Sequence, residues 1–142
     1  MKTLKTLIAA FFLTISVSAF AADDVNNEKL NIDNTLNTYV GAIANGKMNG
    51  LKNILADDMK FTVARAEKVT NYNKAQLLNS LKESENVVQN CSTEYEVVKI
   101  NSLQAMVKVI MKYEGFSKIN FISLDKTGTS WKITSISSSY LK

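Results

Sequence analysis

The chain has 142 residues, 17 of them basic and 13 acidic, with a formal net charge of +4 and no histidine. The lack of histidine excludes Ser-His and Cys-His nucleophilic catalysis and His-ligated zinc. Lysines are dispersed and Arg65 is the single arginine, which argues against a nucleic-acid surface. A single cysteine, Cys91, excludes an intramolecular disulfide. We interpret it as a small apolar residue at the start of a strand, with a reactive thiol or an intermolecular bridge as alternatives.

The leader MKTLKTLIAAFFLTISVSAFAADD predicts a secretory signal peptide over residues 1–21. Lys2 and Lys5 precede a short apolar run, and Ala19-Phe20-Ala21 resembles a signal-peptidase site. The run is shorter than the roughly 20 apolar residues that span a bilayer, although a retained anchor is the alternative. We therefore expect a protein exported to the periplasm or the medium, without stable membrane insertion. Loss of Lys2 and Lys5 leaves 15 basic residues against 13 acidic ones, a net charge of +2.

Two helices are predicted after the leader. Residues 22–29 are polar and are interpreted as a flexible lead-in to a single domain over residues 30–142. Helical spacing of apolar residues from Leu30 predicts a first helix that ends at Asn45-Gly46, where glycine supplies the left-handed residue. A second apolar stripe, from Met48 to Leu55, predicts a short helix that ends before Asp57.

The middle of the chain predicts one strand and one further helix. Alternating apolar residues from Met59 to Val63 indicate a half-buried strand, and the pattern weakens between Ala66 and Tyr72. Asn73, followed three residues later by Gln76, resembles a capping box. It predicts a third helix that runs to about Glu85.

The C-terminal half has the period of β-strands. Alternation predicts successive antiparallel strands near 95–100, 106–113 and 119–124 and from Trp131. On the last strand the apolar positions move from odd (Ile133) to even (Ile136), which predicts a bulge near Ser135. Helices followed by strands predict an α+β domain, with helices covering one face of a curved antiparallel sheet. Such a sheet leaves a conical cavity, the default place for a ligand; a cystatin-like single helix on a sheet is the alternative.

The stretch TYVGAIANGKMNGLKNILADDMKF resembles the first two helices and first strand of the NTF2-like superfamily. That superfamily includes ketosteroid isomerases, limonene epoxide hydrolases, SnoaL-like cyclases and the "putative lumazine-binding" group of small bacterial proteins. The order of elements agrees over nearly the whole mature chain. The resemblance therefore implies an NTF2-like cone, on which many chemistries and plain ligand binding occur.

The resemblance also implies roles for single residues. Tyr39 stands where ketosteroid isomerases have the tyrosine that donates a hydrogen bond to the oxyanion. Their general base, an aspartate, is replaced here by Val63, and their second donor falls near Asn120, an amide. A positioned base contributes on the order of a hundredfold to ten-thousandfold, so valine removes that mechanism. Arg65 is the one candidate for the arginine of the epoxide hydrolases, and no carboxylate pair accompanies it. The pair Asp57-Asp58 is interpreted as the polar turn between helix and strand.

These observations favour an exported, non-enzymatic protein that binds a small, partly apolar or aromatic molecule in its cone, without a cofactor or a metal. The predicted pocket residues are Tyr39, Phe61, Val63, Met111, Tyr113, Asn120 and Trp131. One alternative is an enzyme of isomerase, hydrolase or cyclase type whose base is Glu67, Glu94 or Glu96. Another is an interaction module that forms a homodimer through the outer face of the sheet, with the residues Lys108, Ile110, Lys112, Ile122 and Ile136.

Overall fold

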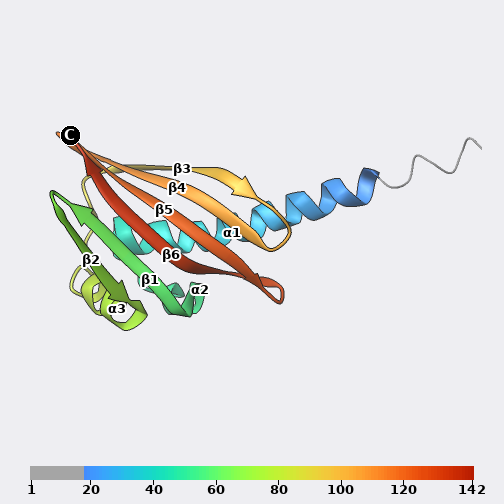
Figure 1. The fold of residues 1–142 in the computed structure, drawn as a ribbon, viewed down its shortest axis with the longest axis horizontal. Helices are drawn as coiled ribbons and strands as arrows, with labels where there is room; N and C mark the ends of the chain where they lie inside the picture. Colours follow the sequence, from blue (N-terminus) through green and yellow to red (C-terminus); the bar gives the residue numbers. More distant parts are fainter. Residues whose placement is uncertain (1–17) are drawn as a thin grey trace, which may run out of the picture.

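The structure is a computed structural model that describes residues 18–142, with side chains from residue 27 onward. The predicted signal peptide lies mostly outside the described residues. The described chain forms, in order, α1 (Ser18–Asn45), α2 (Leu51–Ile54), β1 (Leu55–Arg65), β2 (Lys68–Asn73), α3 (Lys74–Lys82), β3 (Ser92–Ile100), β4 (Gln104–Tyr113), β5 (Phe116–Thr127) and β6 (Ser130–Leu141). Figure 1 shows α1 lying against one face of the sheet, with α3 beside β1 and β2. The α+β class predicted from the sequence is confirmed.

The sheet has six strands in the order β2-β1-β6-β5-β4-β3. The neighbours β1/β2, β3/β4, β4/β5 and β5/β6 pair antiparallel, but β1 pairs parallel to β6, so the sheet is mixed and not purely antiparallel. This parallel pair joins the first strand of the chain to the last, in the interior of the sheet. Strand β2 was not predicted, since it is a short edge strand whose exposed polar residues hide the alternation.

Helix α1 begins before the predicted start at Leu30 and ends at Asn45, as predicted. It includes residues 22–29, where we expected a flexible lead-in; that segment contains neither glycine nor proline to interrupt a helix. Glu28 also fixes this part of α1 to the sheet, because its carboxylate accepts hydrogen bonds from Lys126 and, at 2.6 Å, from the indole Nε1 of Trp131. Gly46 follows the helix with φ of +65°.

The inward-facing residues of the strands form a continuous core with α1. Ile32 and Leu36 of α1 are fully buried against Ile122 and Ile136 of the sheet. The proposal that Ile122 and Ile136 lie on an outer, dimer-forming face is therefore wrong. The interpretation failed because both sides of β5 carry apolar residues, and the outward-facing Phe121 is 43% exposed.

Two local predictions are confirmed. Ser123 pairs with Ser135 whereas Leu124 pairs with Ile133, so Thr134 is an extra residue that forms the bulge expected near Ser135. Asn73 caps α3. Its side-chain oxygen accepts a hydrogen bond from the backbone N–H of Gln76, and the side-chain oxygen of Gln76 accepts one from the backbone N–H of Asn73. Among residues 18–142, no helix is long and apolar enough to cross a membrane.

Candidate ligand pocket

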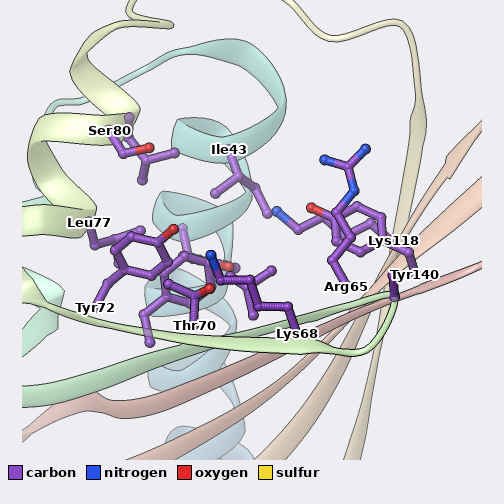
Figure 2. A pocket seen from close by; sticks show the side chains of 14 residues that line it. Ile43, Arg65, Lys68, Thr70, Tyr72, Leu77, Ser80, Lys118 and Tyr140 are labelled. Carbon is purple, nitrogen blue, oxygen red and sulfur yellow. The ribbon is translucent and has the colours of Figure 1, made fainter.

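A cavity of about 560 Å³ lies between the C-terminal half of α1, helix α3 and the face of the sheet that packs on α1. We call this face the concave face. Tyr39 and Ile43 of α1 form one wall, and Leu77 and Ser80 of α3 lie at one end. Figure 2 shows Tyr72 and Leu77 at that end, and Arg65, Lys118 and Tyr140 at the other. The cavity thus has two chemically different ends.

The strand register explains this gradient. Side chains alternate between the two faces of a strand, so paired residues form rows across the concave face. The first row contains Lys68 paired with Arg65, and Tyr140 paired with Lys118. The second contains Thr70, Val63, Ser138 and Asn120, and the third contains Tyr72, Phe61, Ile136 and Ile122. Moving from the first row to the third, the concave face changes from cationic to apolar.

The first row is cationic. The Arg65 guanidinium lies 5.6 Å from the centroid of the Tyr140 ring, and the Lys118 ammonium lies 6.0 Å from the same centroid. Such distances permit cation–π attraction. Burial lowers the pKa of Lys118 from its usual value of 10.5. No aspartate or glutamate is among the residues that line the cavity in the described chain.

The second row and α1 supply uncharged polar groups. Tyr39 is only 2% exposed, and burial, followed by the proximity of Tyr140, raises the pKa of its hydroxyl. At neutral pH it is therefore a phenol that can donate a hydrogen bond. The fully buried Ser138 hydroxyl donates to Asn120 Oδ1, while Asn120 Nδ2 has no partner among the described residues. Asn120 lies one row from Lys118 but is not itself among the residues lining the cavity.

The structure brings together three of the seven predicted pocket residues: Tyr39, Phe61 and Val63 line the cavity. Met111 and Asn120 are buried outside its lining. Tyr113 stacks on Phe116, with ring centroids 4.6 Å apart. Trp131 lies at the start of β6, far along the strand from Tyr140 of the cavity, and its indole donates a hydrogen bond to Glu28. A ligand-binding role for any of these residues stays a prediction.

Sequence reasoning did not identify the cationic residues of the cavity as a group. The resemblance to epoxide hydrolases concerns Arg65 alone, and no motif in the sequence marks Lys68 or Lys118. The alternation of side chains along a strand could have placed two of them on the cavity face. Arg65 lies two residues after Val63, and Lys118 lies two residues before Asn120, so each pair shares a face. Their convergence depends on the parallel pairing of β1 with β6, which places Arg65 beside Tyr140.

The carboxylates named as alternative bases lie elsewhere. Glu67, Glu94 and Glu96 are exposed and do not line the cavity. The other carboxylate of interest, Asp57, accepts a hydrogen bond from the Lys74 ammonium at 2.8 Å, and Lys74 lowers its pKa. Lys74 also donates to the Leu55 carbonyl at 2.8 Å, so this contact ties the start of α3 to β1. The prediction that Asp57 and Asp58 form a turn between helix and strand is wrong, because α2 ends at Ile54 and both aspartates lie within β1. The contacts of Asp57 are nevertheless structural.

Comparisons with known proteins agree with the fold. Residues 27–137 match the model of a family described as "Putative lumazine-binding". The structure is similar to an NTF-2-like protein of unknown function from Silicibacter pomeroyi DSS-3, with a TM-score of 0.72 and 14% identity, covering 82% of this chain and 98% of that chain. An NTF2-like protein of unknown function from Shewanella baltica OS155 gives a TM-score of 0.66 and 15% identity, covering 81% and 94%.

A third similar structure is an NTF-2-like protein of unknown function, PA1314, from Pseudomonas aeruginosa, with a TM-score of 0.60 and 8% identity over 82% of this chain and 99% of that chain. At these identities the likeness shows the fold alone. A search of curated proteins found no match. Because the family model spans most of the chain, this protein belongs to the family described as putative lumazine-binding, within the NTF2-like fold.

Proposed function

We propose that this protein binds a small, flat, partly apolar molecule in the cavity between α1, α3 and the concave face of the sheet. The observation that carries the proposal is the cavity itself, whose volume of about 560 Å³ is bordered by the aromatic rings of Tyr39, Phe61, Tyr72 and Tyr140. Cavities that hold small ligands commonly measure about 300–1,000 Å³ and combine apolar walls with a few polar groups. The description of the family as putative lumazine-binding supports a flat, two-ring ligand.

The apolar end of the cavity suits an aromatic ligand. The rings of Phe61 and Tyr72 have centroids 5.6 Å apart and are tilted by 31°, so together they present a broad apolar surface on adjacent strands. Aromatic pairs gain about 0.5–1.5 kcal/mol beyond the burial of their area, and a flat ligand gains the same kind of contact. The Tyr39 hydroxyl offers the ligand a hydrogen bond from the opposite wall.

Binding of lumazine and of 2-naphthamide, two flat and uncharged two-ring probes, tests this proposal by isothermal titration calorimetry. We expect at least one of them to bind, and Phe61→Ala to weaken its binding tenfold or more. Phe121→Ala is the matched control, because Phe121 is exposed on the other face of the sheet. Equal loss of binding in both variants, or no binding of either probe or of their charged analogues, would overturn the proposal.

We also propose that the protein acts outside the cytoplasm, on the strength of the leader over residues 1–21. The mass of the protein purified from a periplasmic or culture-medium fraction measures this directly. A mass that corresponds to a chain starting at Ala22 supports export. A full-length chain retained in the cytoplasm contradicts it.

A further inference from the structure

The cationic end of the cavity differs from the other charged sites of the molecule. The ion pairs found in the described chain join Lys74 to Asp57, Lys112 to Glu94 and Lys126 to Glu28. None of them includes Arg65, Lys68 or Lys118, although these three side chains line one cavity. Figure 2 shows Arg65 and Lys118 beside the same ring, that of Tyr140. Three cationic side chains, none of them in an ion pair among the described residues, thus line one cavity.

Position in the fold separates Lys118 from ordinary solvated lysines. Arg65 and Lys68 are exposed, but Lys118 is half-buried on the concave face, where its ammonium loses part of its hydration. Removing a charged group from water costs free energy unless an opposite charge accompanies it. The half-buried Lys118, together with two exposed cations that line the same cavity, therefore favours the entry of an anion, and the attraction is strongest where water is least.

The distance between the cationic and apolar rows defines the shape of the anion. Arg65 and Phe61 are four residues apart on β1, which corresponds to about 13 Å along an extended strand. An anionic group at the level of Arg65 and Lys118 leaves room for a two-ring body that reaches Phe61 and Tyr72. Arginine is well suited to a carboxylate or phosphate because its planar guanidinium binds two oxygens at once.

We propose that the cavity selects an amphiphilic anion: a flat apolar body that carries a carboxylate, phosphate or sulfonate group, held at the open end by Arg65, Lys68 and Lys118. This inference rests on the proposed function, since it names the class of ligand that the same cavity takes. The ligand enters with its apolar end first. Its charge stays near Tyr140, and its rings contact Phe61.

A pair of probes that differ only in charge tests the inference. We expect 2-naphthoate to bind at least tenfold more tightly than 2-naphthamide in calorimetric titrations at neutral pH and low salt. Lys118→Met and, separately, Arg65→Gln should reduce this ratio at least threefold, mainly by weakening the binding of naphthoate. Added sodium chloride should weaken the binding of naphthoate and leave that of naphthamide nearly unchanged, because salt screens charge.

Lys60→Met is the matched control. Lys60 is exposed on β1, an odd number of residues from Arg65 and therefore on the outer face, so its loss changes the net charge equally without altering the cavity. The naphthoate preference should survive in this variant. Circular dichroism spectra that match the unchanged protein confirm that each variant is folded.

The outcomes separate the inference from the function on which it rests. Equal affinities for the two probes, with Phe61→Ala still weakening both, would overturn anion selection and leave the ligand-binding function intact. A naphthoate preference that Lys60→Met reduces as much as Lys118→Met would also overturn it, since net charge alone would then explain the preference. Failure of 2-naphthoate and 2-naphthamide to bind would overturn the inference, and the proposed function falls with it if lumazine does not bind either.

Discussion

Strand β5 carries a lysine near each end, and the two lysines have different surroundings. Lys118 and Lys126 are an even number of residues apart, so both lie on the concave face. Lys126 is paired with Glu28 of α1, which also accepts from Trp131. Lys118 forms no ion pair with a carboxylate of the described residues; its neighbours at the cavity are Arg65 and the Tyr140 ring. At one end charge fixes the helix to the sheet, and at the other end lies the charge that we propose receives an anionic ligand.

The space between the two lysines shows a matching contrast in packing. Beside Lys126 the concave face is filled by side chains of α1, which leave Leu124 and Ile133 fully buried. Beside Lys118 the same face is open, and Val63 and Phe61 remain half-exposed along the cavity. The difference follows from α1, whose bulky residues cover the filled end. Stability should therefore reside in the filled end, and ligand binding in the open one.

Truncation of core side chains should give the largest effect. Ile122→Ala removes a fully buried side chain and should lower the free energy of unfolding by about 2–5 kcal/mol. Val63→Ala at the cavity should cost about 1 kcal/mol or less, since each fully buried methylene contributes about 0.8 kcal/mol and Val63 is half-exposed. Urea denaturation measures both. An equal loss of unfolding free energy in the two variants would mean that the cavity is closed in solution and that both ends of the concave face are packed alike.

Close packing between the end of α1 and the segment after α3 depends on Gly46. A Cβ atom at Gly46 would lie 2.6 Å from Asn86 N and Ser84 O, in the segment that follows α3 and donates from Asn86 N to the Gly46 carbonyl. Gly128 has nearly the same φ, +64°, but nothing within 4 Å of its Cβ position. Both alanine variants bear the backbone strain of a positive φ, and overpacking commonly costs a further 1–3 kcal/mol or so.

We therefore expect Gly46→Ala to be less stable than Gly128→Ala by about 1 kcal/mol or more in thermal unfolding. Since the backbone strain is common to both variants, the difference between them reports the contact alone. Indistinguishable melting temperatures would show that the segment after α3 is not held against the end of α1.

Protonation of Glu28 should selectively weaken the filled end. The hydrogen bond from Lys126, then that from Trp131, lower the pKa of Glu28 below 4.5 in the folded protein. Its stabilising contribution is therefore complete above pH 4.5 and is lost as the pH falls through the folded-state pKa. Glu28→Gln should lower the melting temperature near neutral pH, and the gap from the unchanged protein should narrow in acid. A gap that is constant with pH would contradict the ion pair.

Replacement of Lys118 should give the smallest change in stability, and it should stabilise the protein, whereas the preceding substitutions destabilise it. Burial lowers its pKa, so the folded protein disfavours the charged form at pH values below the folded-state pKa, and this penalty fades as the pH rises toward 10.5. Lys118→Met should therefore raise the melting temperature slightly at neutral pH, with a smaller gain near pH 10. Lys60→Met, whose side chain is exposed, should change stability by no more than about 0.5 kcal/mol. A loss of stability in Lys118→Met at neutral pH would show an unrecognised structural role for its ammonium.

Much of this fold could be predicted from local patterns. The end of α1 at Gly46, the capping box at Asn73 and the bulge beside Ser135 each depend on a few neighbouring residues, and all three are confirmed. The face of β5 was harder to assign, because apolar residues occupy both faces and the buried Asn120 interrupts the inner one.

The candidate site could be predicted only in part. Tyr39, Phe61 and Val63 were found through the resemblance of their segment to a known fold. The cationic end could not be found in this way, since Arg65, Lys68 and Lys118 belong to three strands whose register depends on long-range pairing. Dispersed lysines appear ordinary in sequence, and only the folded chain shows which of them lack carboxylate partners.

We propose that Arg65, Lys68 and Lys118 hold the charged group of a flat ligand at one end of the cavity. The measurement that tests it most directly is a crystal structure of the protein with bound 2-naphthoate. We predict a carboxylate within hydrogen-bond distance of the Lys118 ammonium or the Arg65 guanidinium, with the rings against Phe61. A carboxylate directed away from both cations, or a ligand bound on the outer face near Phe121, would contradict the account.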